Sequence, residues 1–512
     1  MTALQPSAAP RWLRALSAAR TITGTPGPAR GISHDSRRVG RGDIFVAIPG
    51  ATADGNSFIG SAIARGASAV VVQDDRRAAW EAQVVPGVAF VGVPDARAAL
   101  AEAAAGLYGE PAATLGMVGV TGTDGKTTTT HLVAHVLSAC GLRAGYLSSV
   151  AFSDGESAVL NASHMTTLEA SDVQRELRRI ADAGARYAAV EASSIGLELH
   201  RVDRCEFDVA VFTNLTPDHL DFHGTMDAYG AAKAKLFAML AQSPDKGLAK
   251  AAVVFADDPA SELMLTAAPG VPPVRYSLRD GGDITANELR SDGLGMRFVL
   301  RASGRSIEAR APLLGDYNVA NCLAAAAVAM SQGVPVSDAA DALASFRGVP
   351  GRMEHIDEGQ PFAVIVDIAS TEPAMRNVLR ALRPATSGKL IVVFGAAGER
   401  DVARRSGIAR AAAEGADFAV IANEDPRSED PDAIIAEIAR ALDGAGWREG
   451  TRFVREPDRR RAIALAFERA GADDTVLLAG KGTEQSIVIG REHLPWDERV
   501  VARELLRGIR RV

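Results

Sequence analysis

The chain has 512 residues, a hydrophobic fraction of 47% and a formal net charge of -7, values typical of a globular enzyme with two or three domains. This charge gives no electrostatic reason to expect binding to nucleic acid or to a membrane. The three scattered cysteines are too few for a disulfide framework or a cysteine-based zinc site, and they favour a cytoplasmic location.

The first block, residues 1–109, alternates short apolar runs with helix-like stretches. Residues 1–20 lack the continuous apolar stretch of a signal peptide, and no later run is long enough to span a bilayer. The runs 44–48 and 69–72 predict strands, and the segments 58–65 and 100–105 predict helices. Gly-Glu-Pro at 109–111 indicates a linker to the next block.

The second block, residues 110–350, opens on a strand, a glycine loop and a helix. Residues 115–120 predict a buried strand, and residues 127–140 predict a helix that ends at Gly141. In such a loop the N–H groups and the helix N-terminus face phosphates, a lysine neutralises their charge, and a threonine can ligate Mg²⁺. The first glycine of the standard motif is replaced by Val120, and a chance surface turn is the simpler alternative. The flanking strand and helix favour an ATP site built from Gly122, Thr123, Asp124, Gly125, Lys126, Thr127 and Thr128.

Further apolar runs of this block end in polar residues. The runs 188–191 and 209–214 predict parallel strands, and ligands collect at the carboxyl ends of such strands. Residues 213–224 place two carboxylates and two histidines within six positions, which suits either a metal–phosphate site or a surface loop. A helix from about residue 226 carries Lys233 and Lys235, and an alanine-rich helix is predicted over 318–332.

The third block, residues 351–512, repeats the strand–loop–helix order. The runs 364–367, 390–395, 418–421 and 476–482 predict strands that end in polar or glycine-rich loops. We therefore predict an α/β protein with an N-terminal α/β domain (1–109), a central P-loop ATPase domain with a parallel sheet (110–350) and a C-terminal Rossmann-like domain (351–512).

The stretch 214–224 and the lysine that follows it resemble the N-L-x-x-D-H-L-D-[FY]-H-G…A-K signature of the Mur ligases. These ATP-dependent amide ligases extend the peptide of the peptidoglycan precursor. Further motifs at 33–37, 42–47, 166–167, 191–194, 200–202, 315–321 and 351–354 are similar to motifs of the members that add the third residue. The resemblance covers nearly the whole chain and implies that the first block binds a UDP precursor and the third block an amino acid.

The resemblance also implies the chemistry and the residues that perform it. A substrate carboxylate attacks the γ-phosphate of ATP, and an amine then displaces phosphate from the acyl phosphate. The implied catalytic residues are Lys126, Lys233, Glu191 and His219. Mg²⁺ would be held by Thr127, Glu191, His219 and a carbamylated Lys233, whose amine must be neutral to react with CO₂.

Three sets of binding residues are implied in the same way. Beside the phosphate loop, ATP would contact Asn318, Asn321, Arg352 and Asp367. The UDP substrate would contact Ser36, Arg37, Thr166, Thr167, Ser193 and Arg201. The amino acid would contact Arg400, Glu424, Asp425, Arg427, Gly480 and Glu484. Each has a simpler interpretation as a helix cap, a turn residue or a solvated surface group.

Three positions depart from the family pattern, because Ser370, Ile195 and Thr483 replace histidines. The departures leave room for a repurposed or non-catalytic member, and an amide ligase of folylpolyglutamate or cyanophycin synthesis is a further alternative. Arg427 favours meso-diaminopimelate over L-lysine or L-ornithine, because a guanidinium can bind its distal carboxylate through two parallel hydrogen bonds. Alternatively, Arg427 pairs internally with Glu429 or Asp430. A monomer is expected.

Overall fold

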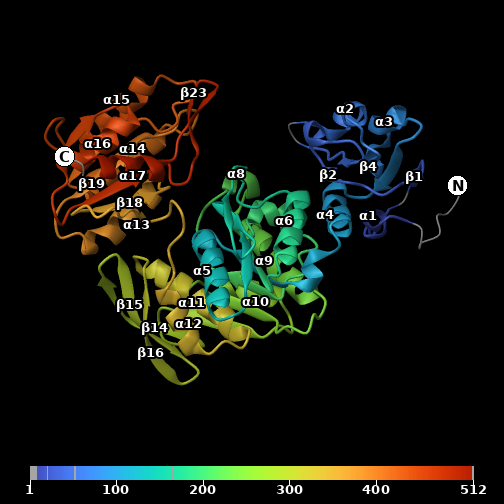
Figure 1. Ribbon diagram of the computed structural model, residues 1–512, viewed down its shortest axis with the longest axis horizontal. Coiled ribbons are helices and arrows are strands. Elements are labelled where there is room, and N and C mark those ends of the chain that lie inside the picture. Colours follow the sequence, from blue (N-terminus) through green and yellow to red (C-terminus); the bar gives the residue numbers. More distant parts are fainter. Residues whose placement is uncertain (1–8, 20, 51–52, 164, 510–512) are drawn as a thin grey trace. The chain divides into compact units, whose positions relative to one another are not determined.

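Three parallel-dominated sheets organise the computed structural model, which describes residues 9–19, 21–50, 53–163 and 165–509 (Figure 1). The chain divides into two compact units. The first unit comprises residues 1–285, 302–305 and 320–342, and the second comprises 286–301, 306–319 and 343–512. The predicted three-domain α/β fold class is confirmed, whereas the boundaries after residues 109 and 350 stay predictions.

The N-terminal sheet of the first unit has five strands. Its order is β1 (Thr21–Thr23), β5 (Ala89–Val93), β4 (Ala69–Gln73), β3 (Ile44–Val46) and β2 (Ile32–Ser33), and only β1 runs antiparallel to its neighbour. The predicted strands at 44–48 and 69–72 are confirmed as β3 and β4, although β3 ends at Val46. The accompanying helices are α1 (Arg11–Arg14), α2 (Ile59–Ala64), α3 (Arg77–Trp80) and α4 (Ala96–Leu107), so both predicted helices are confirmed.

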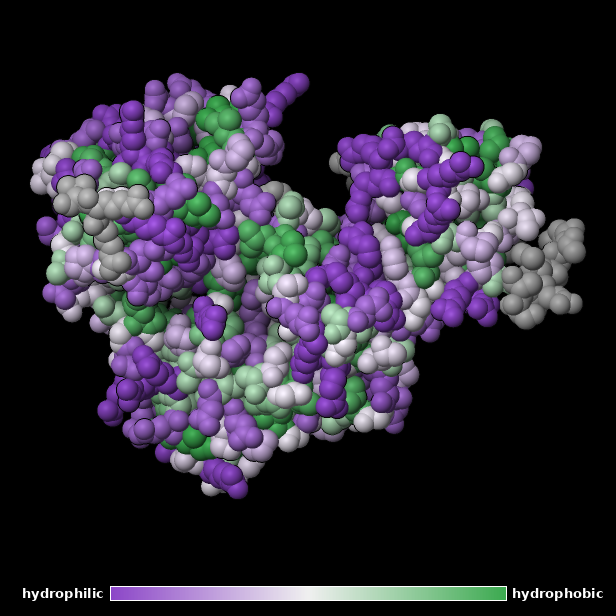
Figure 2. Space-filling view, in the orientation of Figure 1, coloured by the Kyte–Doolittle hydropathy of each residue, from purple (hydrophilic) through white to green (hydrophobic). Residues whose placement is uncertain are grey.

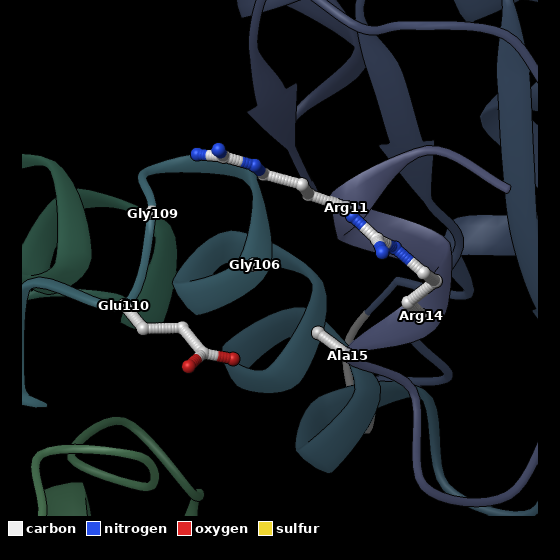
Figure 3. A pocket seen from close by; sticks show the side chains of 6 residues that line it. All are labelled: Arg11, Arg14, Ala15, Gly106, Gly109 and Glu110. Atoms are coloured by element: carbon white, nitrogen blue, oxygen red, sulfur yellow. The ribbon is translucent and has the colours of Figure 1, made fainter. Parts of the chain in front are cut away.

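The small residues of α4 let α1 pack closely against it. A Cβ on Gly106 would lie 2.7 Å from the carbonyl oxygen of Arg11. A cavity of about 330 Å³ beside this contact is lined by Arg11, Arg14, Ala15, Gly106, Gly109 and Glu110. Figure 3 shows Arg11 and Arg14 projecting from α1 and Glu110 from the segment after α4. None of the predicted site residues lines this cavity.

The central sheet places the phosphate-loop strand between two parallel neighbours. β6 (Gly116–Thr121) pairs with β10 (Tyr187–Glu191) on one side and with β11 (Val209–Phe212) on the other. Parallel pairing continues outward through β7 (Ala144–Leu147), β12 (Ala251–Phe255), β13 (Pro273–Ser277) and β14 (Ile284–Asp292). β8 (Ala151–Ser153) and β9 (Ala158–Leu160) add antiparallel strands beyond β7, and β15 (Gly295–Ala302) and β16 (Arg305–Ala311) follow β14 in the strand order.

Helices connect the strands of this sheet and supply the residues at its carboxyl edge. Apolar residues of β6, β10 and β11 are buried with those of α6 and α9 in one core cluster. Because both faces of a parallel sheet are covered, these strands are largely apolar up to their carboxyl ends, where β6 ends in Thr121 and β10 in Glu191. The helices are α5 (Lys126–Ala139), α6 (Ala170–Asp182), α7 (Ser194–Glu198), α8 (Leu220–His223), α9 (Met226–Gln242), α10 (Ser261–Ala267), α11 (Asp316–Ser331) and α12 (Val336–Ala344).

The C-terminal sheet lies within the second unit. Its order is β17 (Glu354–His355), β18 (Ala363–Asp367), β22 (Thr475–Ala479), β19 (Leu390–Phe394), β20 (Phe418–Ile421) and β21 (Phe453–Arg455), parallel except at β17. One core cluster packs α13 (Glu372–Leu382), α14 (Ala403–Gly415) and α15 (Pro431–Gly444) on the sheet. A second packs α16 (Arg459–Arg469) and α17 (Glu498–Ile509). The predicted doubly wound domain is confirmed, and β23 (Ser486–Ile489) and β24 (Glu492–Pro495) form a separate hairpin.

Figure 2 shows hydrophilic residues spread over the visible face, with small hydrophobic areas between them. Within the described part of the chain, every helix is too short or too polar to cross a membrane.

Candidate active site

The phosphate loop leaves β6 after Thr121 and enters α5 at Lys126, as predicted. Gly122 and Gly125 have φ angles of 149° and 81°, in the region that favours glycine. A Cβ on Gly122 would collide with the Thr213 hydroxyl, and one on Gly125 would lie 2.5 Å from Oδ1 of Asn321. The loop therefore requires both glycines for conformation and for space.

Polar residues at the end of β11 hold the phosphate loop in place. The Thr213 hydroxyl donates to the Asp124 carbonyl at 2.6 Å, and the Asp124 amide donates to Oδ1 of Asn214 at 2.9 Å. The Thr123 amide donates to the Asn214 carbonyl at 2.9 Å. The polar end of this strand, noted in the sequence, thus orders the loop.

Lys126 begins α5 and bends back over the loop. Its ammonium donates to the carbonyl oxygens of Gly122 at 3.1 Å and Thr123 at 2.8 Å. One turn further along α5, the Thr129 hydroxyl donates to Oδ1 of Asn321 at 3.1 Å. The structure therefore brings Asn321, predicted from the resemblance, to the start of the phosphate-loop helix.

Thr127 and Glu191 meet at the carboxyl ends of β6 and β10. The Thr127 hydroxyl lies 3.1 Å from both carboxylate oxygens of Glu191, which is buried. The Ser149 amide also donates to this carboxylate at 2.8 Å, and the Ser149 hydroxyl lies 3.0 Å from that of Thr127. Hydroxyl and carboxylate oxygens are ligands that Mg²⁺ prefers. Sequence reasoning missed Ser149, which follows β7 and belongs to no recognised motif.

Lys233 of α9 is buried beside the phosphate loop, with 1% of its surface exposed. Its Nζ donates to the Gly122 carbonyl at 2.6 Å and lies 4.1 Å from the centre of the Tyr229 ring. Burial, reinforced by the charge of Lys126, lowers the pKa of Lys233 to about 6. The amine is therefore largely neutral at pH 7 and above, as carbamylation requires. By contrast, Lys235 is exposed and pairs with Glu198 at 2.5 Å.

His219 precedes the short helix α8 and is more exposed than the other predicted catalytic residues. It has a φ of 51°, and its ring lies 3.4 Å from the Asp218 carboxylate. His223 instead contacts the Ser194 hydroxyl at 3.0 Å, an interaction that the sequence did not indicate. No group of three or more His, Cys, Asp or Glu side chains is arranged to hold a metal in the described part of the chain. The role of His219 stays a prediction.

Three of the predicted UDP-substrate residues gather behind Glu191. The Thr167 hydroxyl donates to the Glu191 carbonyl at 2.9 Å and lies 3.0 Å from the Ser193 hydroxyl. Arg201 donates to the Thr167 carbonyl at 3.3 Å and pairs with Glu169 at 2.7 Å. Ser193 also caps α7, as its simpler interpretation as a helix cap expected. This structural role is compatible with a role in substrate binding. Thr166 precedes this group in the chain and is partly buried.

The remaining two UDP-substrate residues lie in the N-terminal sheet region, directly after β2. Ser36 is buried, whereas the Arg37 side chain is 87% exposed. The Arg37 guanidinium binds Asp35 at 2.8 Å and lowers the pKa of that carboxyl to about 2. The exposed guanidinium leaves room for a ligand at this turn.

In the second unit, Asp367 ends β18 and is buried. Its carboxylate accepts hydrogen bonds from the amides of Met353 and Ala369, both at 2.8 Å. Burial raises its pKa, and the nearby Arg352 charge opposes that rise. The structure thus brings Arg352 and Asp367 together. Asn318, in the same unit, donates from its side chain to the Leu314 carbonyl at 2.8 Å.

The predicted amino-acid residues lie on loops after β19, β20 and β22. Glu424 faces Gly480 so closely that a Cβ on that glycine would lie 2.7 Å from Oε2 of Glu424. Burial raises the pKa of Glu424 to about 7. Asp425 and Glu484 both bind Lys481, at 2.8 Å and 2.5 Å. Lys481 is fully buried. It directly follows Gly480 in the sequence, but it was not among the residues predicted for this site.

Arg427 lies after Pro426 with a φ of 53°, and its guanidinium is 3.9 Å from Glu399. The two carboxylates considered as internal partners of Arg427 contact other groups. Glu429 binds Arg405 at 2.6 Å, and Asp430 caps α15. The internal pairing of Arg427 with Glu429 or Asp430, considered from the sequence, is therefore not seen. Arg400 is exposed on the neighbouring loop after β19.

Comparison with known proteins matches all three parts of the chain to one family. Residues 28–108 match the Mur ligase family catalytic domain, 120–329 the Mur ligase middle domain, and 351–482 the Mur ligase glutamate ligase domain. The chain therefore belongs to the Mur ligase family, as its motifs predicted.

Relatives named for their enzymatic activity match the chain over almost its full length. The chain is 45% identical to a UDP-N-acetylmuramyl-tripeptide synthetase of Roseiflexus sp. (strain RS-1), over 93% of this chain and 94% of the relative. It is 40% identical to a UDP-N-acetylmuramoyl-L-alanyl-D-glutamate–2,6-diaminopimelate ligase of Geobacillus kaustophilus, over 92% and 93%. A solved structure of a ligase with that activity matches with 32% identity and a TM-score of 0.65, covering 94% of this chain and 96% of the other.

Proposed function

We propose that the protein is an ATP-dependent ligase that adds meso-diaminopimelate to UDP-N-acetylmuramoyl-L-alanyl-D-glutamate in peptidoglycan biosynthesis. Full-length relatives that carry this activity in their names support the proposal. The observation that carries the catalytic part is the arrangement of Lys126, Lys233 and Glu191 around one phosphate loop.

The first chemical step transfers a phosphoryl group. The carboxylate of the D-glutamate residue attacks the γ-phosphorus of ATP, the bond to the β-phosphate oxygen breaks, and ADP leaves. The chain's contribution is charge neutralisation and positioning, because little covalent chemistry is required of the protein. Lys126, which binds the carbonyls of the loop, would turn from them to the transferred phosphate. The loop amides and the start of α5 would face the same phosphates.

The hydroxyl of Thr127 and the carboxylate of Glu191 fit a hard divalent cation. Together with His219 and carbamylated Lys233, they would hold Mg²⁺. When bound, Mg²⁺ neutralises phosphate charge. The lowered pKa of Lys233 supports carbamylation, since a neutral amine adds to CO₂ and gives two oxygens in place of a repelling ammonium.

The second step forms the amide bond. The amine of the incoming amino acid attacks the acyl carbon, a tetrahedral intermediate forms, and phosphate leaves as the amine loses its proton. Asp425, Gly480 and Glu484 lie on adjoining loops, which supports a role for them in orienting that amino acid. Arg427, which is not bound to Glu429 or Asp430, is suited to bind a distal carboxylate in two parallel hydrogen bonds.

Two alternatives make different demands on the same residues. A ligase for L-lysine or L-ornithine would give Arg427 no substrate carboxylate to bind, and only the pair with Glu399 at 3.9 Å would remain. A non-catalytic member would have no use for a lysine held neutral beside the phosphate loop, so the pKa of Lys233 favours catalysis. We also propose that the protein is cytoplasmic and acts as a monomer. Size-exclusion chromatography with light scattering would test the monomeric state.

The decisive experiment measures phosphate release with ATP, Mg²⁺, the UDP-dipeptide and each of three amino acids. We expect the highest kcat/KM with meso-diaminopimelate and a preference that is lost in Arg427→Ala. Arg455→Ala is the matched control, because Arg455 pairs with Glu449 at the surface. A parental enzyme that prefers L-lysine or L-ornithine would refute the substrate assignment, and one without ATP-dependent turnover would refute the ligase activity.

A further inference from the structure

A buried ion pair lies behind the loops of the proposed amino-acid site. Arg459 begins α16 and Glu498 begins α17, and their side chains are 1% and 0% exposed. The guanidinium binds the carboxylate through both Nε and Nη2, the latter at 2.7 Å. The Trp496 indole donates to the same carboxylate at 2.8 Å. The orientation of the guanidinium is therefore fixed by the C-terminal helix.

The same guanidinium also binds the backbone at the ends of two strands. Its Nη2 donates to the Ala479 carbonyl at 2.7 Å, and its Nη1 donates to the Asn423 carbonyl at 3.2 Å. Ala479 is the last residue of β22 and directly precedes Gly480. Asn423 directly precedes Glu424. One side chain thus ties together the starting points of two loops.

Those two loops have little room to move relative to one another. Glu424 already lies against the Cα of Gly480, and Lys481 bridges to Asp425 at 2.8 Å. A change of a few tenths of an ångström in the separation of the strand ends would alter where these side chains point. Reacting groups must be held to about half an ångström for efficient catalysis.

We infer that Arg459 and Glu498 are positioning residues that set the geometry of the amino-acid site, and that the C-terminal helix α17 is thereby part of that site. The inference rests on the proposed function. Arg459 does not touch the substrate. It acts through the carbonyls of Asn423 and Ala479, and Glu498 acts through Arg459.

Two variants separate positioning from simple stabilisation. Arg459→Lys keeps a charge, but one ammonium cannot span Glu498 and both carbonyls. The double variant Arg459→Met/Glu498→Leu replaces the buried ion pair by apolar groups, which avoids the buried unpaired charge that removal of one partner would leave. The matched control is Arg460→Ala, because Arg460 also links α16 to α17, through an exposed pair with Glu504 at 2.8 Å.

The full-length enzyme is assayed for KM of each substrate and for kcat, and its melting temperature is recorded. We expect both Arg459 variants to raise KM for meso-diaminopimelate about tenfold, with KM for ATP changed by no more than about twofold. Arg460→Ala should match the parent. This selective rise in one KM is not expected of a residue that only stabilises the domain.

Other results overturn the inference. An unchanged KM for the amino acid, or equal changes for all substrates, would remove the positioning role. Failure of the double variant to fold would make the pair a stability element. The parental assay tests the proposed function separately: if the parent prefers another amino acid, the same comparison is made with that one. A parent without turnover would refute both, whereas an active parent with unaffected variants would refute only this inference.

Discussion

Two buried lysines stand at the two candidate sites, in surroundings of opposite charge. Lys233 lies beside a single loop carbonyl with the charge of Lys126 nearby, and its pKa falls to about 6. Lys481 lies between the carboxylates of Asp425 and Glu484. The two side chains are buried to the same degree. Burial alone therefore does not decide what a lysine contributes, because the neighbouring charges determine whether it is suited to chemistry or to structure.

The largest effect is expected at the phosphate loop itself. Lys126→Ala would remove the main cationic contact proposed for the transferred phosphate and should lower kcat at least about 100-fold. Phosphate release at saturating substrates measures the change. Lys235→Ala is the control, since Lys235 pairs with Glu198 at the surface of the same unit. A variant that forms product at nearly the parental rate would show that the loop does not bind the reacting phosphate.

The second effect concerns stability at Lys481. Lys481→Met leaves Asp425 and Glu484 facing each other without a cation, and should cost about 3 kcal/mol in the free energy of unfolding. Chemical denaturation at pH 7 measures this difference. Stability equal to that of the parent would mean that solvent or other groups satisfy the two carboxylates.

Lys233→Met should raise the free energy of unfolding at pH 7. It removes the cost of keeping the buried amine unprotonated, about 5 kcal/mol, but it loses the hydrogen bond to the Gly122 carbonyl and the packing of the side chain, which should leave a net gain of about 2 kcal/mol. In the unfolded chain the lysine binds a proton up to its ordinary pKa of 10.5, whereas in the folded protein it releases the proton above about 6. Unfolding therefore takes up a proton between these values, and the stability of the parent rises with pH across that window. The variant lacks this dependence, so its advantage should shrink towards pH 10.

Carbon dioxide must be removed for this measurement, because carbamylation would change the group that titrates. The same Lys233→Met variant should be nearly inactive, and high bicarbonate should not restore it. A stability difference independent of pH would contradict the lowered pKa, and substantial activity would contradict the carbamate.

The smallest effect is expected at the exposed turn of the N-terminal sheet. Arg37→Ala should raise KM for the UDP substrate by about two- to fivefold, because the guanidinium is solvated and already paired with Asp35. The control is Arg77→Ala, whose exposed pair with Glu81 lies elsewhere in the same part of the chain. An unchanged KM would remove Arg37 from the proposed UDP site.

The features that the sequence predicted best are those formed by residues adjacent in the chain. The phosphate loop was predictable because its strand, glycines and helix start are contiguous, and the buried strands of the C-terminal sheet were predictable because they are apolar throughout. The strands β7 to β9 and β12 to β16 were not predicted. Several of them are short, or alternate exposed and buried residues. The Asp-Gly pairs at 154–155 and 292–293 are turn signals between such strands, and they could have indicated these hairpins.

The contacts of the candidate site were harder to predict, because they join distant segments. Ser149 reaches Glu191 from another strand, and nothing beside Ser149 in the chain indicates that role. Lys481 and Arg459 look like ordinary charged residues until the fold buries them between loops. The resemblance named Lys233, but only the structure shows why its amine is neutral: it is buried beside Lys126.

The shared acceptor at Gly122 has a consequence for how Lys126 can move. A peptide oxygen carries two lone pairs, and here one receives the Lys126 ammonium and the other receives Lys233. If Lys126 turned towards a bound phosphate, Lys233 would still donate a hydrogen bond to this oxygen. Lys126 could then exchange this backbone carbonyl for a phosphate oxygen without leaving the buried Gly122 carbonyl without a donor. The backbone of the loop would not have to move for this exchange.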